Sequence, residues 1–431
     1  MAAFEHDLET LFATGGLTSD QAAKRAAGAS PTVRRRAAEL DASVAQLEAA
    51  ERARIPVLSG KASYTRLSHL DPPVLQGIPT GFFPVLQNSY VFQGQLSVPL
   101  SDYVLRYPAV TDAARLGTEA ARLGKRTSEV GAGQDARLAY YEWLRARLQV
   151  LIAQRQLAQV QSTLGQVRAL AEAQRLSRAD LMRVESQAAQ AEQTLDQLQQ
   201  FSLLREEQLR LLIGAPPNEP LALGEDIRTD VAASQVAPLD QLMGTAKQQR
   251  LEFRSIDVGI QAKDRQRDAE TANLLPRLSA FGGIDYDNPN PRVFPAKDEF
   301  TLTWQVGAQL SWTLNDALIA DTTQHRLRAE ASELRADREN LEHGTRIEVM
   351  AAQQAVSLAQ HALSTTQKGL SAAEESYRVR RELLNAERAT AVELVDAETE
   401  LTRARIAALN ARVDLRVARA QLDHAVGNDT K

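Results

Sequence analysis

Proline is distributed very unevenly along this chain of 431 residues. Of its 16 prolines, none lies between Ala109 and Ala215, and none follows Pro295. Proline breaks helix interiors, and both proline-free runs are rich in the helix-forming residues Ala, Leu, Gln, Glu and Arg. These runs predict very long helices, since about 60 residues of helix would extend about 90 Å.

Composition and motifs argue against several classes of protein. The hydrophobic content of 44% and charged content of 24% are those of a folded protein, and a net charge of -5 gives no broad basic field for nucleic acid. There is no cysteine, which excludes disulfides and thiolate sites. The six histidines are scattered, and no phosphate-binding loop or nucleophile motif occurs. We therefore predict no enzyme, no cofactor and no metal site.

The sequence contains no recognisable membrane-spanning helix and no recognisable signal peptide. No run approaches the ~18 apolar residues of a membrane-spanning helix. The start Met1–His6 lacks the basic and apolar regions of a signal peptide. If the protein is exported, we expect this sequence to be the mature form.

Alternating segments rich in aromatic residues interrupt the helical runs. From Phe300 to Leu314, apolar residues alternate without exception with polar or small ones. Tyr90–Leu100 repeats the pattern, and weaker strands begin near Leu58 and Leu278, where Phe281 breaks the polar face. The first segment exceeds the ~9–11 residues that a tilted strand needs to cross a bilayer.

Two interpretations of these strands remain open from alternation alone. A soluble antiparallel sheet with one buried face alternates in the same way. The setting favours a membrane, because four strands among long helices have no covering layer. Four strands also cannot close a barrel, which takes about eight, so several protomers would share one.

The chain also repeats internally. Gln95–Asp102 matches Gln309–Asp316, and Ala179–Glu185 matches Val392–Glu398. The domains predicted are a first repeat at 1–214 (strands about 57–67 and 89–100), a linker or equatorial element at 215–240, and a second repeat at 241–431 (strands about 277–286 and 299–313). Heptad spacing from Leu181 to Ser202 and from Leu394 to Leu422 indicates coiled-coil helices, although any antiparallel helical hairpin would share it.

Four segments resemble the TolC-type outer-membrane efflux protein (outer membrane factor) family: Leu17–Pro31, Val98–Asp102, Leu176–Leu181 and Arg388–Asp396. The sequence departs from the family at Tyr103 and Val104, where glycines usually follow the strand, and at both tips, which lack the usual glycine. The resemblance covers nearly the whole chain.

The resemblance implies a mainly α fold with a small membrane β part. It implies a homotrimer with a 12-stranded β-barrel and a 12-helix periplasmic α-barrel. Such a channel lies in the outer membrane lipid of a Gram-negative bacterium and extends into the periplasm. It is the passive exit duct of a tripartite efflux or type I secretion system, and it works with a periplasmic adaptor (membrane fusion) protein and an inner-membrane pump.

Site residues follow from positions in the matched motifs. Glu393 and Asp396 match the family's acidic constriction rings, and Asp180 matches the acidic tip position of the first repeat. Three copies of each carboxylate around a narrow pore would attract cations. Tip ion pairs or adaptor docking are assigned to Arg175, Arg178 and Arg388, although each of these charges also fits an ordinary solvated helix face.

Aromatic residues are assigned by their place in the strands or loops. The lipid-facing girdle is predicted to comprise Tyr64, Tyr90, Phe92, Trp304 and Trp312. Phe82, Phe83 and Phe294 are expected in external loops.

Two alternative functions fit the sequence less well. A periplasmic coiled-coil adaptor would need small Gly-rich β-domains flanking one hairpin, whereas this chain has two hairpins. A structural helical scaffold would leave the alternating aromatic strands unexplained.

Overall fold

A computed structural model describes the chain except for residues 1–10, 71–83, 175–176, 229–235, 387 and 431. Helices dominate, with a small antiparallel sheet, so the predicted fold class is confirmed. In chain order the elements are β1 (Phe12–Leu17), α2 (Ser19–Ala29), α3 (Pro31–Arg52), β2 (Val57–Arg66), β3 (Asn88–Val98), α4 (Leu100–Leu105), α5 (Tyr107–Glu172), α6 (Arg178–Ile213), α7 (Leu239–Gln249), α8 (Leu251–Thr271), η1 (Ala272–Leu274), β4 (Arg277–Asn288), β5 (Thr301–Ser311), α9 (Leu314–Asn385), α10 (Ala391–Val426) and η2 (Asn428–Thr430).

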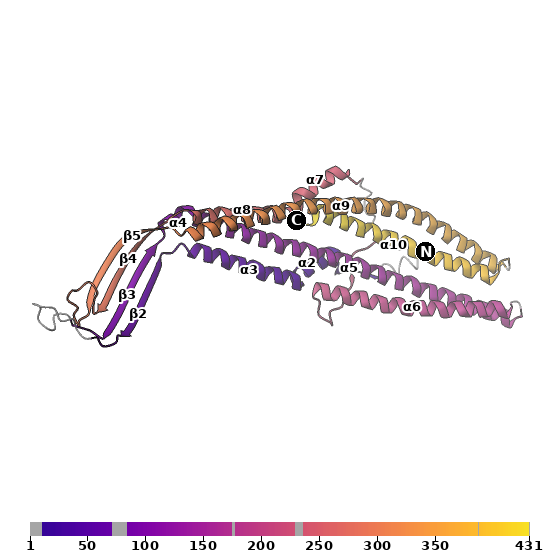
Figure 1. The fold of residues 1–431 in the computed structure, drawn as a ribbon. Helices are drawn as coiled ribbons and strands as arrows, with labels where there is room; N and C mark the ends of the chain where they lie inside the picture. Colours follow the sequence, from indigo (N-terminus) through magenta and orange to yellow (C-terminus); the bar gives the residue numbers. More distant parts are fainter. Residues whose placement is uncertain (1–10, 71–83, 175–176, 229–235, 387, 431) are drawn as a thin grey trace, which may run out of the picture. The chain divides into compact units, whose positions relative to one another are not determined.

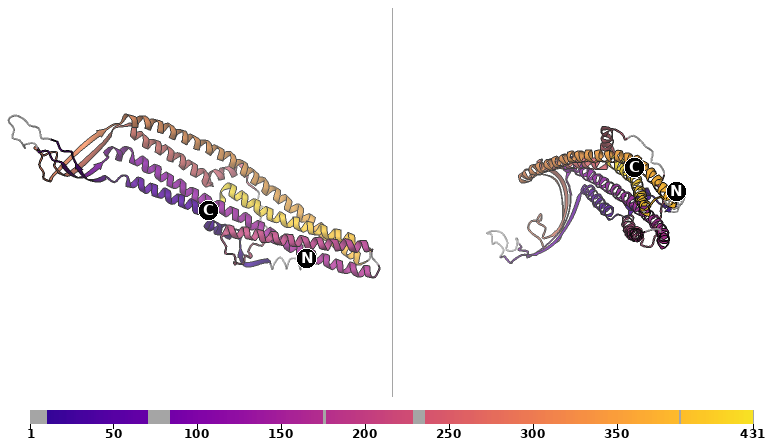
Figure 2. Two further views of the ribbon diagram at one scale, coloured as in Figure 1. Left: turned by 60° about the horizontal axis from the view of Figure 1, so that its bottom comes forward. Right: turned by 90° about the vertical axis from the view of Figure 1, so that its right-hand side faces the viewer.

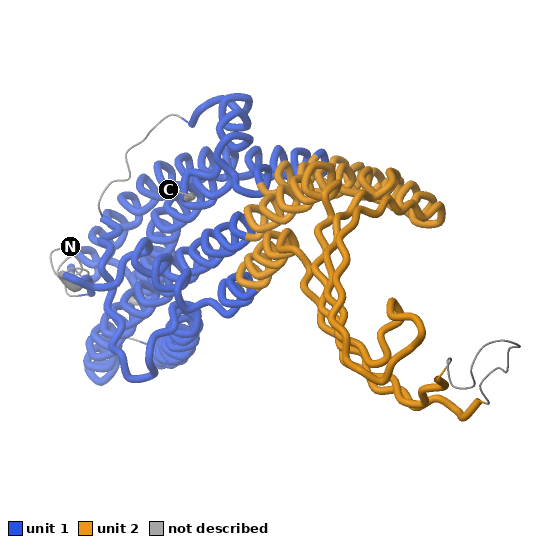
Figure 3. Tube along the Cα trace, turned by 90° about the vertical axis from the view of Figure 1, so that its left-hand side faces the viewer, with its two compact units in different colours: residues 1–38, 122–254, 339–431 blue, residues 39–121, 255–338 orange. Residues whose placement is uncertain are grey.

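The chain divides into two compact units that do not coincide with the two halves of the sequence (Figure 3). Unit 1 comprises residues 1–38, 122–254 and 339–431, and unit 2 comprises residues 39–121 and 255–338. Each unit therefore combines segments from both halves of the chain.

Unit 2 contains a four-stranded antiparallel sheet in the order β2-β3-β4-β5. The pairs Tyr64↔Tyr90 and Ile284↔Trp304 fix the register within the two hairpins, and Gly94↔Ile284 joins one hairpin to the other. The sheet is visibly curved (Figure 2). Residues 67–87 and 289–300 connect the strands at one end of the sheet, and helices continue from the other end.

Unit 1 contains most of two helical hairpins, α5–α6 and α9–α10 (Figure 1); residues 107–121 of α5 and 314–338 of α9 belong to unit 2. The first helix of each hairpin is very long, with 66 residues in α5 and 72 in α9. Both second helices have 36 residues, and each ends at a glycine in the left-handed conformation, Gly214 and Gly427. Glycine adopts this conformation without steric cost and lets a helix end sharply.

The core of unit 1 is built around the fully buried Trp143, Tyr140 and Leu144 of α5. The heptad seam of α10 is largely buried, including Leu401, Ala408, Ala411, Leu415 and Ala418. No helix in the described part of the chain is both long enough and apolar enough to cross a bilayer.

A short strand, β1, was not among the strands predicted from the sequence. It lies against the segment 222–224, where the N–H of Leu17 donates to Ala222 (2.8 Å) and the N–H of Gly224 donates to Leu17 (2.9 Å). Gly16 and Gly224 touch backbone to backbone: a Cβ on Gly224 would lie 2.2 Å from the Gly16 carbonyl oxygen. Only glycine fits this crossing.

Candidate functional site

One face of the sheet in unit 2 is apolar from strand to strand. The register aligns Ala62, Phe92, Tyr286 and Leu302 in one row across the sheet. Further rows add the residues Leu58, Tyr64, Tyr90, Leu96, Val98, Leu278, Ala280, Ile284, Trp304, Val306, Ala308 and Leu310. A soluble sheet would bury such a face, because apolar surface in contact with water is unfavourable. Here Leu302 is 65% exposed, Trp304 71% and Val306 77%.

The opposite face of the sheet is polar. In β5 it carries only Thr, Gln, Gly and Ser, from Thr301 to Ser311. Besides Val57 and Val91, this face carries an aromatic residue, Phe281, which pairs with Gly307; a Cβ at Gly307 would lie 2.8 Å from the Phe281 ring. Because Gly307 has no side chain, the Phe281 ring can pack against it on the polar face.

All five residues predicted for the girdle are described. Tyr64 and Tyr90 form a cross-strand pair with ring centroids 5.0 Å apart, near the loop end of the sheet. Phe300, which the girdle prediction omitted, stacks on Tyr286 (5.1 Å) and lies 5.9 Å from Tyr90. The loop end therefore carries an aromatic cluster that also includes Phe92.

The two tryptophans predicted for the girdle lie outside this aromatic cluster. Trp304 lies in the middle of the apolar face, beside Ile284, and Trp312 follows the helix end of β5. Phe294 is exposed in the β4–β5 connection, while Phe82 and Phe83 lie outside the described residues.

The acidic residue at the α5–α6 tip, Asp180, belongs to a helix cap. Ser177 is the N-cap of α6, and its Oγ accepts a hydrogen bond from the Asp180 N–H at 3.1 Å. The same hydroxyl lies 2.6 Å from the Asp180 carboxylate and donates to it. A carboxylate at this position also interacts favourably with the helix dipole.

Glu393 is held in the equivalent way at the α9–α10 tip. Thr390 and Glu393 form a complete capping box, with both backbone-to-side-chain distances at 3.2 Å. Arg380 of α9 also lies 3.1 Å from the Glu393 carboxylate. Glu393 therefore both caps α10 and pairs with the other helix of its hairpin.

Asp396 links the two hairpins. Its carboxylate lies 3.5 Å from Arg183 of α6, and both side chains are more than half exposed. Such an exposed pair contributes about 0.2–1 kcal/mol.

In the described part of the chain, neither Arg178 nor Arg388 pairs with these carboxylates. Arg178 borders a cavity together with Arg168 and Glu172, Arg388 is exposed, and Arg175 lies outside the described residues. The described partners of the acids are instead Arg183 and Arg380. Arg183 could have been found from the repeat, because it occupies the position in α6 that matches Asp396 in α10.

A buried carboxylate, Glu398, lies near the same tips and was not singled out from the sequence. It is 3% exposed, and Thr163 of α5 donates a hydrogen bond to it at 2.9 Å. Burial raises the pKa of Glu398, opposed by hydrogen bonds from Thr163 and Gln159 and by the charge of Arg381. Glu398 therefore resists ionisation more than an exposed glutamate.

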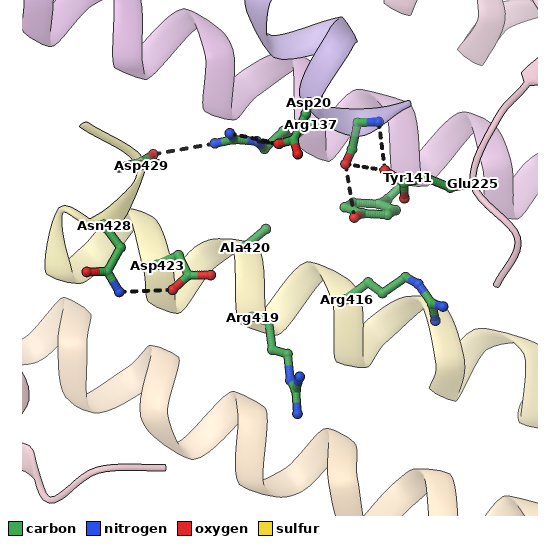
Figure 4. Close-up of a pocket in the computed structure, with 11 residues that line it drawn as sticks. Asp20, Arg137, Tyr141, Glu225, Arg416, Arg419, Ala420, Asp423, Asn428 and Asp429 are labelled. Atoms are coloured by element: carbon green, nitrogen blue, oxygen red, sulfur yellow. Dashed lines mark hydrogen bonds and ion pairs between the residues drawn. The ribbon is translucent and has the colours of Figure 1, made fainter. Parts of the chain in front are cut away.

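A polar cavity of about 520 Å³ lies elsewhere in unit 1 (Figure 4). Glu225 accepts hydrogen bonds from the N–H and hydroxyl of Ser19, and Tyr141 donates to Ser19 at 3.3 Å. Burial raises the pKa of Tyr141 to about 12, so it remains a protonated donor at neutral pH. Arg137 of α5 pairs with Asp20 at 3.0 Å. These contacts hold the N-terminal segment against α5 and provide no activated nucleophile.

The described residues contain no group of three or more His, Cys, Asp or Glu side chains able to hold a metal ion.

A curved sheet with an exposed apolar face, followed by paired helical hairpins, defines the outer-membrane channel class of fold. Among solved structures, the chain is similar to CusC, with 17% identity, a TM-score of 0.79, and coverage of 97% of this chain and 93% of that one. It is similar to VceC of Vibrio cholerae, with 16% identity, a TM-score of 0.75, and coverage of 95% and 96%. MtrE of Neisseria gonorrhoeae has 17% identity, a TM-score of 0.74, and coverage of 96% and 89%.

The sequence model of the outer membrane efflux protein family matches residues 242–428. No curated protein sequence matches the chain. Residues 242–428 thus resemble the outer membrane efflux protein family, and the whole chain has the fold of the solved outer-membrane channels, which confirms the predicted resemblance. Members of this family are transport conduits rather than enzymes.

Proposed function

We propose that this chain is one protomer of a homotrimeric outer-membrane channel, the exit duct of a tripartite efflux or type I secretion system. It is a passive conduit without an enzymatic step, in the outer membrane of a Gram-negative bacterium. The observation that carries the proposal is the exposed apolar face of the sheet, aligned across all four strands. Lipid is the solvent in which such a face is stable.

The edges of the sheet support a shared barrel. The outer strands β2 and β5 each pair on one side only in this chain. In lipid, an unpaired strand edge costs several kcal/mol per backbone group, so spanning sheets close into barrels. Pairing β5 of one protomer with β2 of the next would close a barrel of twelve strands in a trimer.

The positions of the aromatic residues also support a sheet that spans the membrane. Phe300 and Trp312 bracket β5 and lie about 40 Å apart along an extended strand. A tilt of about 45° reduces this to about 28 Å along the membrane normal, close to the ~30 Å hydrocarbon thickness. Tyr64, Tyr90 and Phe92 then face the outer interface and Trp312 the periplasmic one.

The helix ends support the proposed tandem repeat of 1–214 and 241–431, joined by the element 215–240. The N-caps Ser177 and Thr390, and the C-caps Gly214 and Gly427, are related by the same offset. We assign the long hairpins of both repeats to a periplasmic α-barrel of twelve helices. Exposed apolar residues of unit 1, including Leu203 and Leu211 of α6 and Ile347 and Leu358 of α9, would be covered by neighbouring protomers.

At the periplasmic tips we assign the constriction to Glu393 and Asp396, with Asp180 as a further acidic position. Three copies of each would attract cations and impede flow. The pairs Arg380–Glu393 and Arg183–Asp396 would hold the tips closed. The exposed tip residues Arg178 and Arg388, together with Arg175, would contact the periplasmic adaptor, which couples the channel to an inner-membrane pump.

The test is to purify the protein in detergent and add it to planar lipid bilayers. We expect a heat-modifiable trimer that conducts ions in discrete steps and is blocked by divalent cations from the tip side. A monomer that stays in solution without detergent and forms no channels would overturn the proposal. That result would favour the adaptor or scaffold alternatives, neither of which accounts for the exposed apolar face.

A further inference from the structure

The apolar face of the sheet is not uniform, because a groove of about 410 Å³ crosses it. Gly60 and Gly94 lie directly opposite each other in the register, so neither strand supplies a side chain at this point. Phe92, Ile284 and Tyr286 border the groove. Its volume is in the range of small-ligand sites, and apolar side chains dominate its rim.

The two glycines differ in the space around them. A Cβ on Gly94 would lie 3.2 Å from the Ile284 side chain, so Gly94 is required by close packing. A Cβ on Gly60 would meet nothing closer than 4.0 Å. Packing in the chain therefore does not require glycine at position 60, and its absent side chain leaves the groove open.

A basic residue stands on the same face, toward the loop end of the groove. Arg66 follows Gly60 by an even number of residues along β2, so both project from one face. Its guanidinium donates to Asn88 (2.9 Å) and Gln87 (3.1 Å), which are both neutral amides. Within the described ranges no carboxylate pairs with Arg66, so its described partners leave the positive charge uncompensated.

We propose that Arg66 and the Gly60–Gly94 groove together bind one phosphorylated, acylated lipid of the outer leaflet. The lipid phosphate contacts the free N–H groups of Arg66, and an acyl chain passes Tyr64 into the groove. This inference rests on the proposed function, since it requires the sheet in the membrane with its loops outward.

The spacing suits such a lipid. Arg66 and Gly60 are separated by about 20 Å along an extended strand, or about 14 Å along the membrane normal at a tilt of 45°. That is about one leaflet, so a headgroup at Arg66 places the end of its acyl chain at the groove. Arginine suits phosphate because its planar fork donates two parallel hydrogen bonds.

The test uses lipid A as the probe and three variants of the full-length trimer. Gly60→Leu fills the groove in a position that tolerates a Cβ, and Arg66→Gln removes the charge. Gly282→Leu is the matched control: it adds the same side chain to the same face, where the nearest atom to a Cβ is 3.9 Å away, but outside the groove.

Detergent-solubilised trimers would be titrated with lipid A, and bound lipid counted by native mass spectrometry. We expect saturable binding to wild type and Gly282→Leu, up to one lipid per protomer. Gly60→Leu and Arg66→Gln should each bind at least tenfold more weakly, since each buried methylene contributes about fourfold. Inorganic phosphate alone should not compete.

Equal affinity of wild type and Gly60→Leu for lipid A would overturn the inference, as would equal loss in Gly282→Leu. Conductance in planar bilayers separates this failure from that of the proposed function. A wild-type trimer that conducts without retaining lipid A refutes only the lipid site. A protein that neither trimerises nor conducts refutes the channel and the site with it.

Discussion

The two helix tips of unit 1 are built alike and charged differently. Ser177 and Thr390 are N-caps at matching positions of the repeat, and each accepts a hydrogen bond from the N–H of the acidic residue three positions on, although the full capping box is described for Thr390 and Glu393. Three residues further along, the first helix carries Arg183 and the second carries Asp396, and these two side chains face each other at 3.5 Å. Both copies of the repeat thus have a capping residue before the second helix, and they carry opposite charges at the position where α6 and α10 approach each other.

Two glutamates at matching positions show a second contrast. Glu185 of α6 is partly exposed and accepts hydrogen bonds from Arg168 at 2.9 Å, whereas Glu398 of α10 is buried against Thr163. The residue type is the same in both repeats, but the surroundings differ, and burial raises the pKa of Glu398. Charge at the tips therefore depends on packing as well as on sequence.

The largest effect should come from neutralising the acidic tip with Glu393→Gln and Asp396→Asn. Glutamine retains an acceptor for the Thr390 N–H, so the cap survives while the pairs with Arg380 and Arg183 are lost. At about 0.5 kcal/mol per exposed pair, the two pairs lost in each of three protomers shift the balance of open and closed channels about a hundredfold. Bilayer recordings should show higher mean conductance and weaker block by divalent cations.

Glu400→Gln is the control for this prediction, because the described partner of Glu400 is Arg403 of its own helix. Unchanged conductance in the double variant would refute the gate assignment.

Removing the caps should have the next largest effect. Thr390→Ala should destabilise the first turn of α10 by about 1 kcal/mol and speed hydrogen exchange there about fivefold. Ser177→Ala should do the same for α6, since the two caps are equivalent. Thr390→Ser, which retains the hydroxyl, should exchange like wild type; equally fast exchange in Thr390→Ser and Thr390→Ala would contradict the role of the hydroxyl.

A charge swap tests the contact between the hairpins. Arg183→Asp alone places two carboxylates together and should favour the open channel about two- to threefold per pair. Adding Asp396→Arg should restore the wild-type conductance, because the pair re-forms with its charges exchanged. Additive effects of the two substitutions in a double-mutant cycle would show that the residues do not interact.

The smallest effect is a change in pH dependence. Because the pKa of Glu398 is raised in the folded state, ionisation destabilises the fold, and the penalty grows as pH rises above the pKa of the unfolded chain. Glu398→Gln should therefore raise the melting temperature at pH 8 and leave it nearly unchanged near pH 4. Glu185→Gln serves as the exposed control, and an equal gain at both pH values in Glu398→Gln would exclude this cause.

Local patterns made much of the fold predictable. Proline-free runs predicted the long helices, and strict alternation in β5 predicted a two-faced strand, because both depend only on neighbours along the chain. β1 was missed because a six-residue segment with two glycines is stabilised by Leu223, far away in sequence. The acidic tip residues came from motif positions, and their gate role remains a prediction.

The partners of those acids could not be predicted in the same way. Arg380 reaches Glu393 only through the packing of α9 against α10, which no local pattern specifies. Glu398 lies in a helix full of charges, where solvation is the expected state. Its burial depends on α5, whose sequence lies more than two hundred residues earlier.

The pairing of β3 with β4 has a consequence for folding. Its partners, such as Gly94 and Ile284, are separated by about 190 residues, whereas each hairpin forms from neighbouring strands. During synthesis the first hairpin is complete long before its partner strand exists. Its apolar face and the free edge of β3 are therefore open to aggregation for that interval. The second hairpin is exposed for a shorter time, because β4 can pair with a β3 strand that is already made.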